Sequence, residues 1–400
     1  MSEQNIAQLI NESKFSEAFD LLRSGTKLPE NLQEHHKSQI IDQLFRAAQY
    51  DIIFHLLQDK TIETDIYELE NFDRSVFQSV IRHLKSDEDG TAFFKDFICR
   101  FDNINDEVAT QTLLGYFLEK LAPLAWIQIL ADAGCDTNFK NNADENFIHQ
   151  VVKSNERRFE LNETEFNSLR ASYVNFLIGQ GLDINEGNIV AETPLIAAVK
   201  SNKKELIDHL LESGADPNHT DIQGNSAFFY AVAHLQSDQL YDALRAHATP
   251  DFNQVNKNGE SLLFEYVRMM QGGEAGISFL KKLLNDGADL YQVSRWYNAD
   301  KTPLDVIAEK SAGVLEAVLE TGQIDINRQD DQGNTLLHKV SAFNVNYEPD
   351  RAKETYRKVK VLLEYGADAG VTNDQDQTAL MLASDDNLKI KTVELLMKQS

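Results

Sequence analysis

Apolar residues recur in pairs along this chain, at the spacing of one face of a helix. In the clearest stretch, Leu206 and Ile207 precede Gly214 by eight and seven residues, and Leu210 and Leu211 precede it by four and three. Side chains at these offsets form a single stripe, which is the pattern of a helix that buries one face. The same offsets are found, fully or in part, before nine other closing positions: Gly25, Lys60, Phe101, Gly134, Gly181, His247, Gly287, Gly322 and Gly366.

The ten closing positions are spaced almost regularly. Three of the intervals between them are 33 residues, and the others range from 35 to 47 residues. A further helix is expected to open about 21 residues before each closing position. At eight of the expected helix starts, the N-cap position holds a hydroxyl residue or Asn, which are preferred helix N-caps. They are Thr112, Asn146, Thr193, Ser226, Ser261, Thr302, Thr335 and Thr378. With a last pair after Thr378, the sequence predicts eleven helix pairs joined by short segments that we call fingers.

One segment shows the whole unit. Thr193-Pro194-Leu195-Ile196-Ala197-Ala198, followed by Gly214-Ala215-Asp216-Pro217-Asn218, resembles the ankyrin repeat, whose signature is Thr-Pro-Leu-His-x-Ala. The resemblance is strong over residues 131–400 and divergent but in register over 1–130. It implies an all-α, ankyrin-type solenoid of about eleven helix-turn-helix units with β-turn or hairpin fingers, continuous across these two regions. Only His149 and His338 occupy the family's His position, where the resemblance implies a hydrogen bond between neighbouring turns.

Four units are longer than the rest: 75–101, 146–181, 261–287 and 335–366. The extra residues are expected at the turn between the paired helices. The segment 156–171 mixes charged and apolar residues and is expected to extend a helix. The segment 344–355 is polar and contains Pro349, which favours a loop.

One finger, 287–302, spans 15 residues where the others usually span 12. It contains the sequence Arg295-Trp296-Tyr297-Asn298. Trp, Tyr and Arg contribute most of the binding energy in many protein interfaces, provided that a partner desolvates them. Two interpretations of Trp296 stay open: it is exposed at the fingertip as an anchor, or it packs back on the neighbouring turn as local core.

The charge of the chain limits its partners. The sequence has 38 Lys and Arg against 64 Asp and Glu, a formal net charge of −26. This disfavours nucleic acid and an anionic membrane as partners and favours a basic protein, although acidity also serves solubility. The cysteines, Cys99 and Cys135, fit a reducing compartment, and no secretory signal or membrane-spanning run is apparent. We expect a cytoplasmic protein, with delivery into a host cell by a signal-less route left open.

Motifs for catalysis, cofactors and metals are not found in the sequence. We therefore expect no cofactor, no metal and no enzyme activity, and a monomeric protein-binding solenoid that acts as an adaptor, inhibitor or scaffold. The alternatives are a bacterial effector or toxin-immunity protein, an enzyme with a cryptic N-terminal catalytic region, and a structural homo-oligomer. The expected partner contacts lie at the fingertips and on the concave face: Asn141, Asn188, Asp221, Gln223, Asn256, Lys257, Arg295, Trp296, Tyr297, Asn298, Asp330, Gln332, Asn373 and Gln375.

Overall fold

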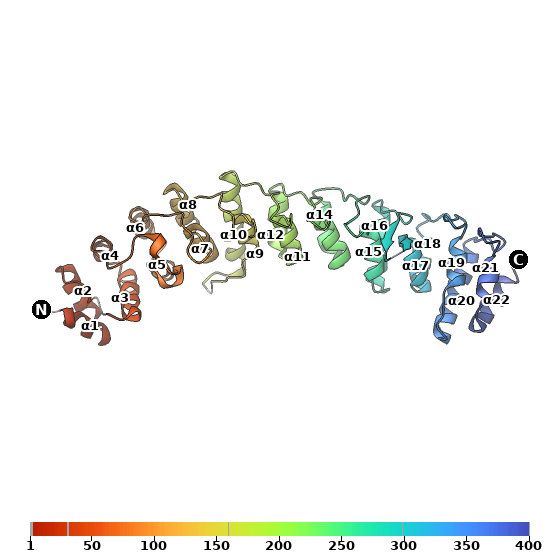
Figure 1. Ribbon diagram of the computed structural model, residues 1–400, viewed down its shortest axis with the longest axis horizontal. Coiled ribbons are helices and arrows are strands. Elements are labelled where there is room, and N and C mark those ends of the chain that lie inside the picture. The colour runs from red at the N-terminus through yellow and green to blue at the C-terminus, as the bar shows by residue number, and fades with distance from the viewer. Residues whose placement is uncertain (1–2, 30–31, 159, 298, 400) are drawn as a thin grey trace. The chain divides into compact units, whose positions relative to one another are not determined.

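The computed structural model describes residues 3–29, 32–158, 160–297 and 299–399. Its contacts divide the chain into two compact units, Met1–Ala215 and Asp216–Ser400, which we call unit 1 and unit 2. Helices are the main secondary structure of each unit, as the apolar pattern predicts (Figure 1). The boundary between the units lies inside the region that the sequence assigns to regular repeats, and the division expected near residue 130 stays a prediction.

Unit 1 contains six helix pairs among the residues described. They are α1 (Glu3–Asn11) with α2 (Phe15–Arg23), α3 (Glu34–Arg46) with α4 (Tyr50–Gln58), α5 (Val76–His83) with α6 (Glu88–Ile98), α7 (Leu113–Glu119) with α8 (Leu124–Asp132), α9 (Phe147–Lys153) with α10 (Glu163–Gly179), and α11 (Pro194–Lys200) with α12 (Lys204–Glu212). Two 3-10 turns, η1 (Ile66–Glu68) and η2 (Phe72–Arg74), lie in the finger before α5.

Unit 2 contains the other five pairs. They are α13 (Ala227–Phe229), continued by the π-helical turn η3 (Tyr230–His234), with α14 (Asp238–Arg245); α15 (Leu262–Met269) with α16 (Glu274–Asn285); α17 (Pro303–Glu309) with α18 (Ala312–Leu319); α19 (Leu336–Ala342) with α20 (Pro349–Glu364); and α21 (Ala379–Ala383) with η4 (Asn387–Lys389) and α22 (Ile390–Leu396). Over the described residues the total is the predicted eleven. Strands β1 (Ser294–Trp296) and β2 (Ala299–Lys301) form an antiparallel hairpin in the long finger, with Arg295 opposite Asp300.

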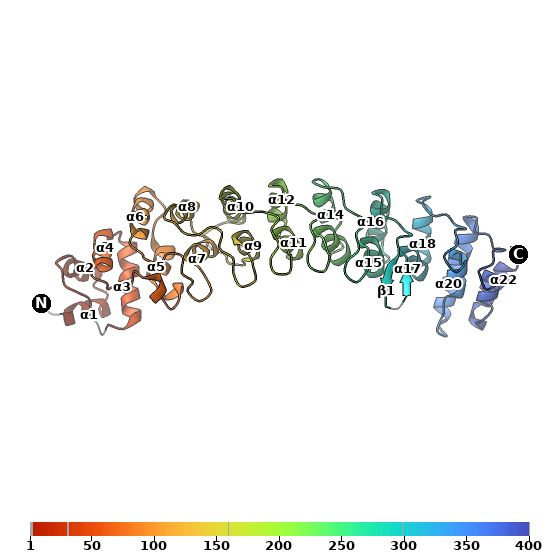
Figure 2. The same cartoon turned by 45° about the horizontal axis from the view of Figure 1, so that its top comes forward.

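Each unit is built as two layers. In unit 1 the first helices of the pairs pack on one another, as α7, α9 and α11 do, and the second helices α8, α10 and α12 form the other row (Figure 2). Unit 2 repeats this arrangement, with α15, α17 and α19 in the first row and α16, α18 and α20 in the second. The predicted stripes face the space between the layers: Leu206, Ile207, Leu210 and Leu211 are at most 3% exposed.

Local signals fix where the helices begin and end. All eight predicted N-cap side chains accept a hydrogen bond from the backbone N–H three residues later, which satisfies an otherwise unpaired donor. At the end of α12, Gly214 has φ +95° and the N–H of Ala215 donates to the carbonyl of Leu210 at 3.0 Å. This is a Schellman turn, and it explains the glycine in the closing position.

The long units are partly helical where a loop was expected. The segment 344–355 was predicted as a loop because it is polar and contains Pro349, and this is wrong from Pro349 onward. Helix α20 begins at Pro349, since proline at the first helical position has no N–H that the helix would need. The expectation for 156–171 is confirmed from Glu163, where α10 begins with a capping box between Asn162 and Glu165.

Cations from one pair cap the first helix of the pair before it. The ammonium of Lys203 donates to the carbonyls of Val152 and Ser154 at the end of α9, at 2.6 and 2.9 Å. A lysine does the same at the ends of α15, α17 and α19, namely Lys310, Lys358 and Lys389. Positive charge at the carbonyl end of a helix complements its dipole, so these contacts couple neighbouring pairs within a unit.

Candidate functional site

Six of the fingertips are each built around one Asn or Asp. Its side-chain Oδ1 accepts backbone N–H groups from the residues two and four positions later, at 2.8–3.1 Å. Such Asx turns replace backbone hydrogen bonds that a tight turn lacks. The six residues are Asn141, Asn188, Asp221, Asn256, Asp330 and Asn373. All were expected to contact a partner, and the structure gives each of them a role inside the turn. Asn188 and Asp221 are only 8% exposed.

The residues next to these turns remain available at the surface. Gln223, Lys257, Gln332 and Gln375 are exposed. Backbone hydrogen bonds at or beside these residues link successive fingers, since the N–H of Lys257 donates to the carbonyl of Gln223 at 2.8 Å and that of Asp374 to the carbonyl of Gln332 at 3.0 Å. Partner contact through these side chains stays a prediction.

In the long finger of unit 2, one of the two adjacent aromatic residues is packed against its neighbours and the other is exposed. Trp296 is half-buried, and the Arg268 guanidinium of α15 lies 4.6 Å from the centre of its ring. Tyr297, next to it, is 81% exposed, and Arg295 is exposed as well. Trp296 therefore packs on the preceding pair while Tyr297 stays accessible. Asn298 lies outside the described residues.

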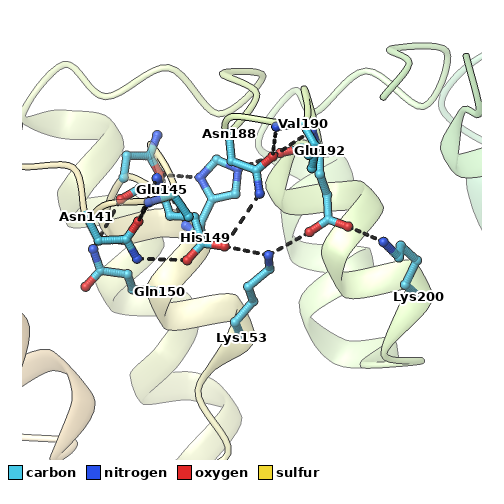
Figure 3. Close-up of polar contacts among 11 residues, drawn as sticks. Asn141, Glu145, His149, Gln150, Lys153, Asn188, Val190, Glu192 and Lys200 are labelled. Atoms are coloured by element: carbon cyan, nitrogen blue, oxygen red, sulfur yellow. Dashed lines mark hydrogen bonds and ion pairs between the residues drawn. The ribbon is translucent and has the colours of Figure 1, made fainter. Parts of the chain in front are cut away.

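A ladder of alternating charges connects two first helices of unit 1 (Figure 3). The Lys153 ammonium of α9 lies 2.6 Å from a Glu145 carboxylate oxygen and 2.7 Å from one of Glu192. Glu192 also pairs with Lys200 of α11. Because Glu192 is only 6% exposed, these pairs replace water around its charge. The available signal of this ladder in the sequence is an offset of eight residues within each of the pairs Glu145/Lys153 and Glu192/Lys200.

Protonation equilibria in the ladder favour the charged forms. Burial raises the pKa of Glu192, but the hydrogen bonds from Lys153 and Lys200 outweigh it and leave that pKa below its ordinary value. Burial likewise lowers the pKa of Lys153, but the bonds to Glu145 and Glu192 leave it raised. Glu192 and Lys153 are therefore both charged at neutral pH.

His149 of α9 lies beside the ladder and is hydrogen-bonded to the finger that precedes α11. Its Nε2 lies 2.8 Å from the carbonyl of Glu192, and its Nδ1 lies 2.9 Å from Asn146 Oδ1. His338 makes the equivalent contact with the carbonyl of Gln377 in unit 2, at 3.0 Å. The hydrogen bond between neighbouring turns that the resemblance implies is confirmed at both positions. Burial lowers the pKa of His149, so its ring is neutral at pH 7.

Each unit has a groove along its first helices. In unit 1 a space of about 520 Å³ lies between α7 and α9, over Gly115, Leu118 and Val151, with the carboxylates of Glu119 and Glu156 at its edge. In unit 2 a space of about 280 Å³ lies beside the hairpin, lined by Phe264, Arg268, Trp296, Lys301, Val306, Glu309 and Lys310. The two grooves differ in the sign of their lining charges.

In the ranges that the structure describes, no group of three or more His, Cys, Asp or Glu side chains is placed to hold a metal ion. Burial raises the pKa of the Cys135 thiol to about 12, which leaves it protonated and unreactive. Among the helices described, none is both long and apolar enough to cross a membrane.

Comparison with known proteins agrees with this geometry. The family model for ankyrin repeats (many copies) matches residues 195–245, and the helix pairs keep the same register on either side of that segment. Over this segment the chain is similar to ankyrin repeats, which agrees with the resemblance found in the sequence.

Among its relatives is the B-cell lymphoma 3 protein homolog of Mus musculus, 25% identical over 202 residues, which are 50% of this chain and 42% of that protein. Another is the ankyrin repeat domain-containing protein M-T5 of Myxoma virus, 33% identical over 116 residues, 28% of this chain and 23% of that protein. The match thus spans less than half of each relative. The solved ankyrin repeat domain of Bcl-3 is 24% identical, covers 61% of this chain and 96% of its own, and has a TM-score of 0.48.

Proposed function

We propose that this chain is a non-enzymatic protein-binding array whose partner is a basic protein. Its relatives are ankyrin repeat proteins, whose repeats serve protein–protein interaction, and the net charge of −26 adds the sign of the expected partner. Neither nucleic acid nor a membrane is its ligand in this proposal, and the chain acts in the cytoplasm as a monomer.

The observation that supports the proposal most directly is a set of unneutralised carboxylates on the last two fingers of unit 2. Asp331, Asp374 and Asp376 are exposed, and none of them forms an ion pair with any other described residue. The backbone bond between Asp374 and Gln332 places the two fingertips next to each other. In unit 1, by contrast, the fingertip carboxylate of Glu186 is already paired with Lys140. Free carboxylates on adjacent tips attract a basic surface and raise its association rate.

The experiment is a quantitative affinity capture from the source organism with the intact chain as bait. The wild type is compared with the triple variant Asp331→Asn, Asp374→Asn and Asp376→Asn, at low and at high salt. We expect basic proteins to be retained by the wild type and lost with the triple variant or in high salt.

A matched control removes the same amount of charge from the second helices. Asp350, Glu320 and Glu364 are exposed carboxylates already paired with lysines, so Asp350→Asn, Glu320→Gln and Glu364→Gln together should leave capture unchanged. Equal capture by the wild type and the fingertip variant would reject the acidic fingertips as the binding surface. A captured set without basic proteins would reject the partner class.

A further inference from the structure

The grooves of the two units differ at one position that can be compared directly. In unit 1, the residue before the N-cap of α11 is Glu192, and its carboxylate lies against Lys153 at the end of the preceding first helix, α9. In unit 2, the residue before the N-cap of α17 is Lys301, and the residue at the end of the preceding first helix, α15, is Arg268. At this step two cations line one groove where unit 1 has a cation and a bridging carboxylate.

The order of acidic and basic residues is also reversed along helix α17 itself. Charged residues eight positions apart, before and at the end of a first helix, are acidic then basic in Glu145/Lys153, Glu192/Lys200 and Glu260/Arg268. At α17 the order is Lys301 then Glu309, which pair at 2.7 Å. An acid at the start and a base at the end of a helix suit its dipole, so the reversed order opposes it. Helix stability alone therefore gives no reason for the reversal.

Apart from Glu309, whose carboxylate is paired with Lys301, the remaining lining of this groove suits an anionic side chain with an apolar stem. Trp296 and Val306 offer apolar surface, and the Arg268 guanidinium lies over the Trp296 ring, held by Glu265. Lys310 donates to the carbonyls of Arg268 and Met270 and forms no ion pair with the described residues. The space of about 280 Å³ is just below the range of about 300–1,000 Å³ that is typical of small-molecule sites, so one side chain fits it.

We infer that the groove beside the hairpin binds a glutamate or aspartate side chain of an extended peptide segment in a protein partner. The carboxylate takes the place that Glu192 holds in unit 1, between Arg268 and Lys301, and its stem packs on Trp296. Exposed Tyr297, beside Trp296, is positioned to contact the flanking residues of the peptide. This site is independent of the acidic fingertips proposed above, and either can fail without the other.

The test begins with a phage-displayed library of random peptides, selected on the intact wild-type chain. The decisive variant is the double exchange Lys301→Glu with Glu309→Lys, which restores the order found in unit 1 and keeps both the ion pair and the net charge. Dye-labelled copies of the enriched peptides are then titrated against each variant by fluorescence anisotropy. A circular dichroism melt confirms that each variant is folded.

We expect enriched peptides to carry an acidic residue whose change to Gln or Asn weakens binding about tenfold, and the double exchange to weaken it by at least as much. Trp296→Ala should also weaken binding, whereas Lys281→Gln, which removes one charge from the exposed face of α16, should leave it within about twofold. Three results would overturn the inference: no enriched peptide, enriched peptides without a required acidic residue, or equal binding to the exchanged variant. Displacement by free glutamate alone would also overturn it, because the occupant would then be a small molecule.

Discussion

The charge ladder of unit 1 predicts a large effect for removing a single ammonium group. In Lys153→Met the apolar stem is retained, but Glu145 and Glu192 lose their shared cation, which lies 2.6 and 2.7 Å from them. At 2.7 Å and an effective dielectric constant of about 20, each contact has a gross attraction of about 6 kcal/mol. Most of this offsets the desolvation of the carboxylates.

The net loss in the free energy of unfolding depends on how exposed the paired side chains are. Removing one member of a fully buried pair costs about 3–5 kcal/mol, and an exposed pair is worth about 0–1 kcal/mol. The side chain of Glu192 is 7% exposed and that of Lys153 37% exposed, so this pair lies between the two limits. We expect Lys153→Met to lower the free energy of unfolding of unit 1 by about 2 kcal/mol at pH 7.

The pH dependence of this stability loss is a second, independent test of the prediction. The lowered pKa of Glu192 means that its contribution is present above the ordinary value of 4.5 and is lost as the pH falls through the folded-state value. The raised pKa of Lys153 means that its contribution is present below 10.5 and is lost as the pH rises through its folded-state value. The ladder thus stabilises unit 1 between these limits, and the difference between wild type and variant should shrink below about pH 4.5.

The assay uses the tryptophans to observe unit 1 alone. The chain has two, and Trp126 is buried in unit 1, so urea titrations in a Trp296→Phe background report the unfolding of that unit by fluorescence. Lys14→Met serves as the control, since its pair with Glu12 is exposed and its loss should leave the free energy of unfolding nearly unchanged. A loss below about 0.5 kcal/mol for Lys153→Met, or a loss of equal size at pH 7 and pH 4, would refute this account.

Three further predictions concern the same unit and the same fluorescence assay. Thr193→Ala removes the N-cap of α11 and should cost about 1 kcal/mol; a neutral result would mean that water replaces the cap. Gly214→Ala should cost about 1 kcal/mol, because φ is +95° and no heavy atom lies within 4 Å of the added Cβ, so the cost is one of backbone conformation alone; a much larger loss would contradict this. Burial lowers the pKa of His149, so stability should fall as the pH drops below its ordinary value of 6.5. His149→Gln should remove that step, and an unchanged pH profile would exclude His149 as its source.

Most of the fold could be predicted because its signals are local. A stripe such as Leu206, Ile207, Leu210 and Leu211 needs only the period of a helix, and a cap such as Thr193 needs only the three residues after it. Pro349 was misinterpreted because proline both ends and begins helices. The stripe before Gly366 predicted the later part of α20, where Val359 and Leu362 are buried, but the polar residues around Pro349 hid its first turns.

The candidate binding residues were harder to predict, because one residue type serves two roles at a fingertip. Asn and Asp are common both in exposed contact surfaces and in turns, and the sequence alone left Asn188 and Asp221 among the contacts. Their distance from the next N-cap was the available signal. Each lies five residues before Thr193 and Ser226, respectively, where the Asx turn leads into the helix.

The charge order along the first helices carries information that neither composition nor periodicity reveals. The first charged residue lies just before the N-cap, and the second is the last residue of a helix of seven residues, which is about 10 Å long. This arrangement produces the offset of eight residues. Attraction along one helix is satisfied by either order, as Glu192/Lys200 and Lys301/Glu309 both show. Only the neighbouring helix distinguishes the two orders, since it presents its own cation to the next finger. A single reversed pair therefore leaves its own helix neutralised and changes the groove beside it, which is why a site can be altered there without disturbing the repeat.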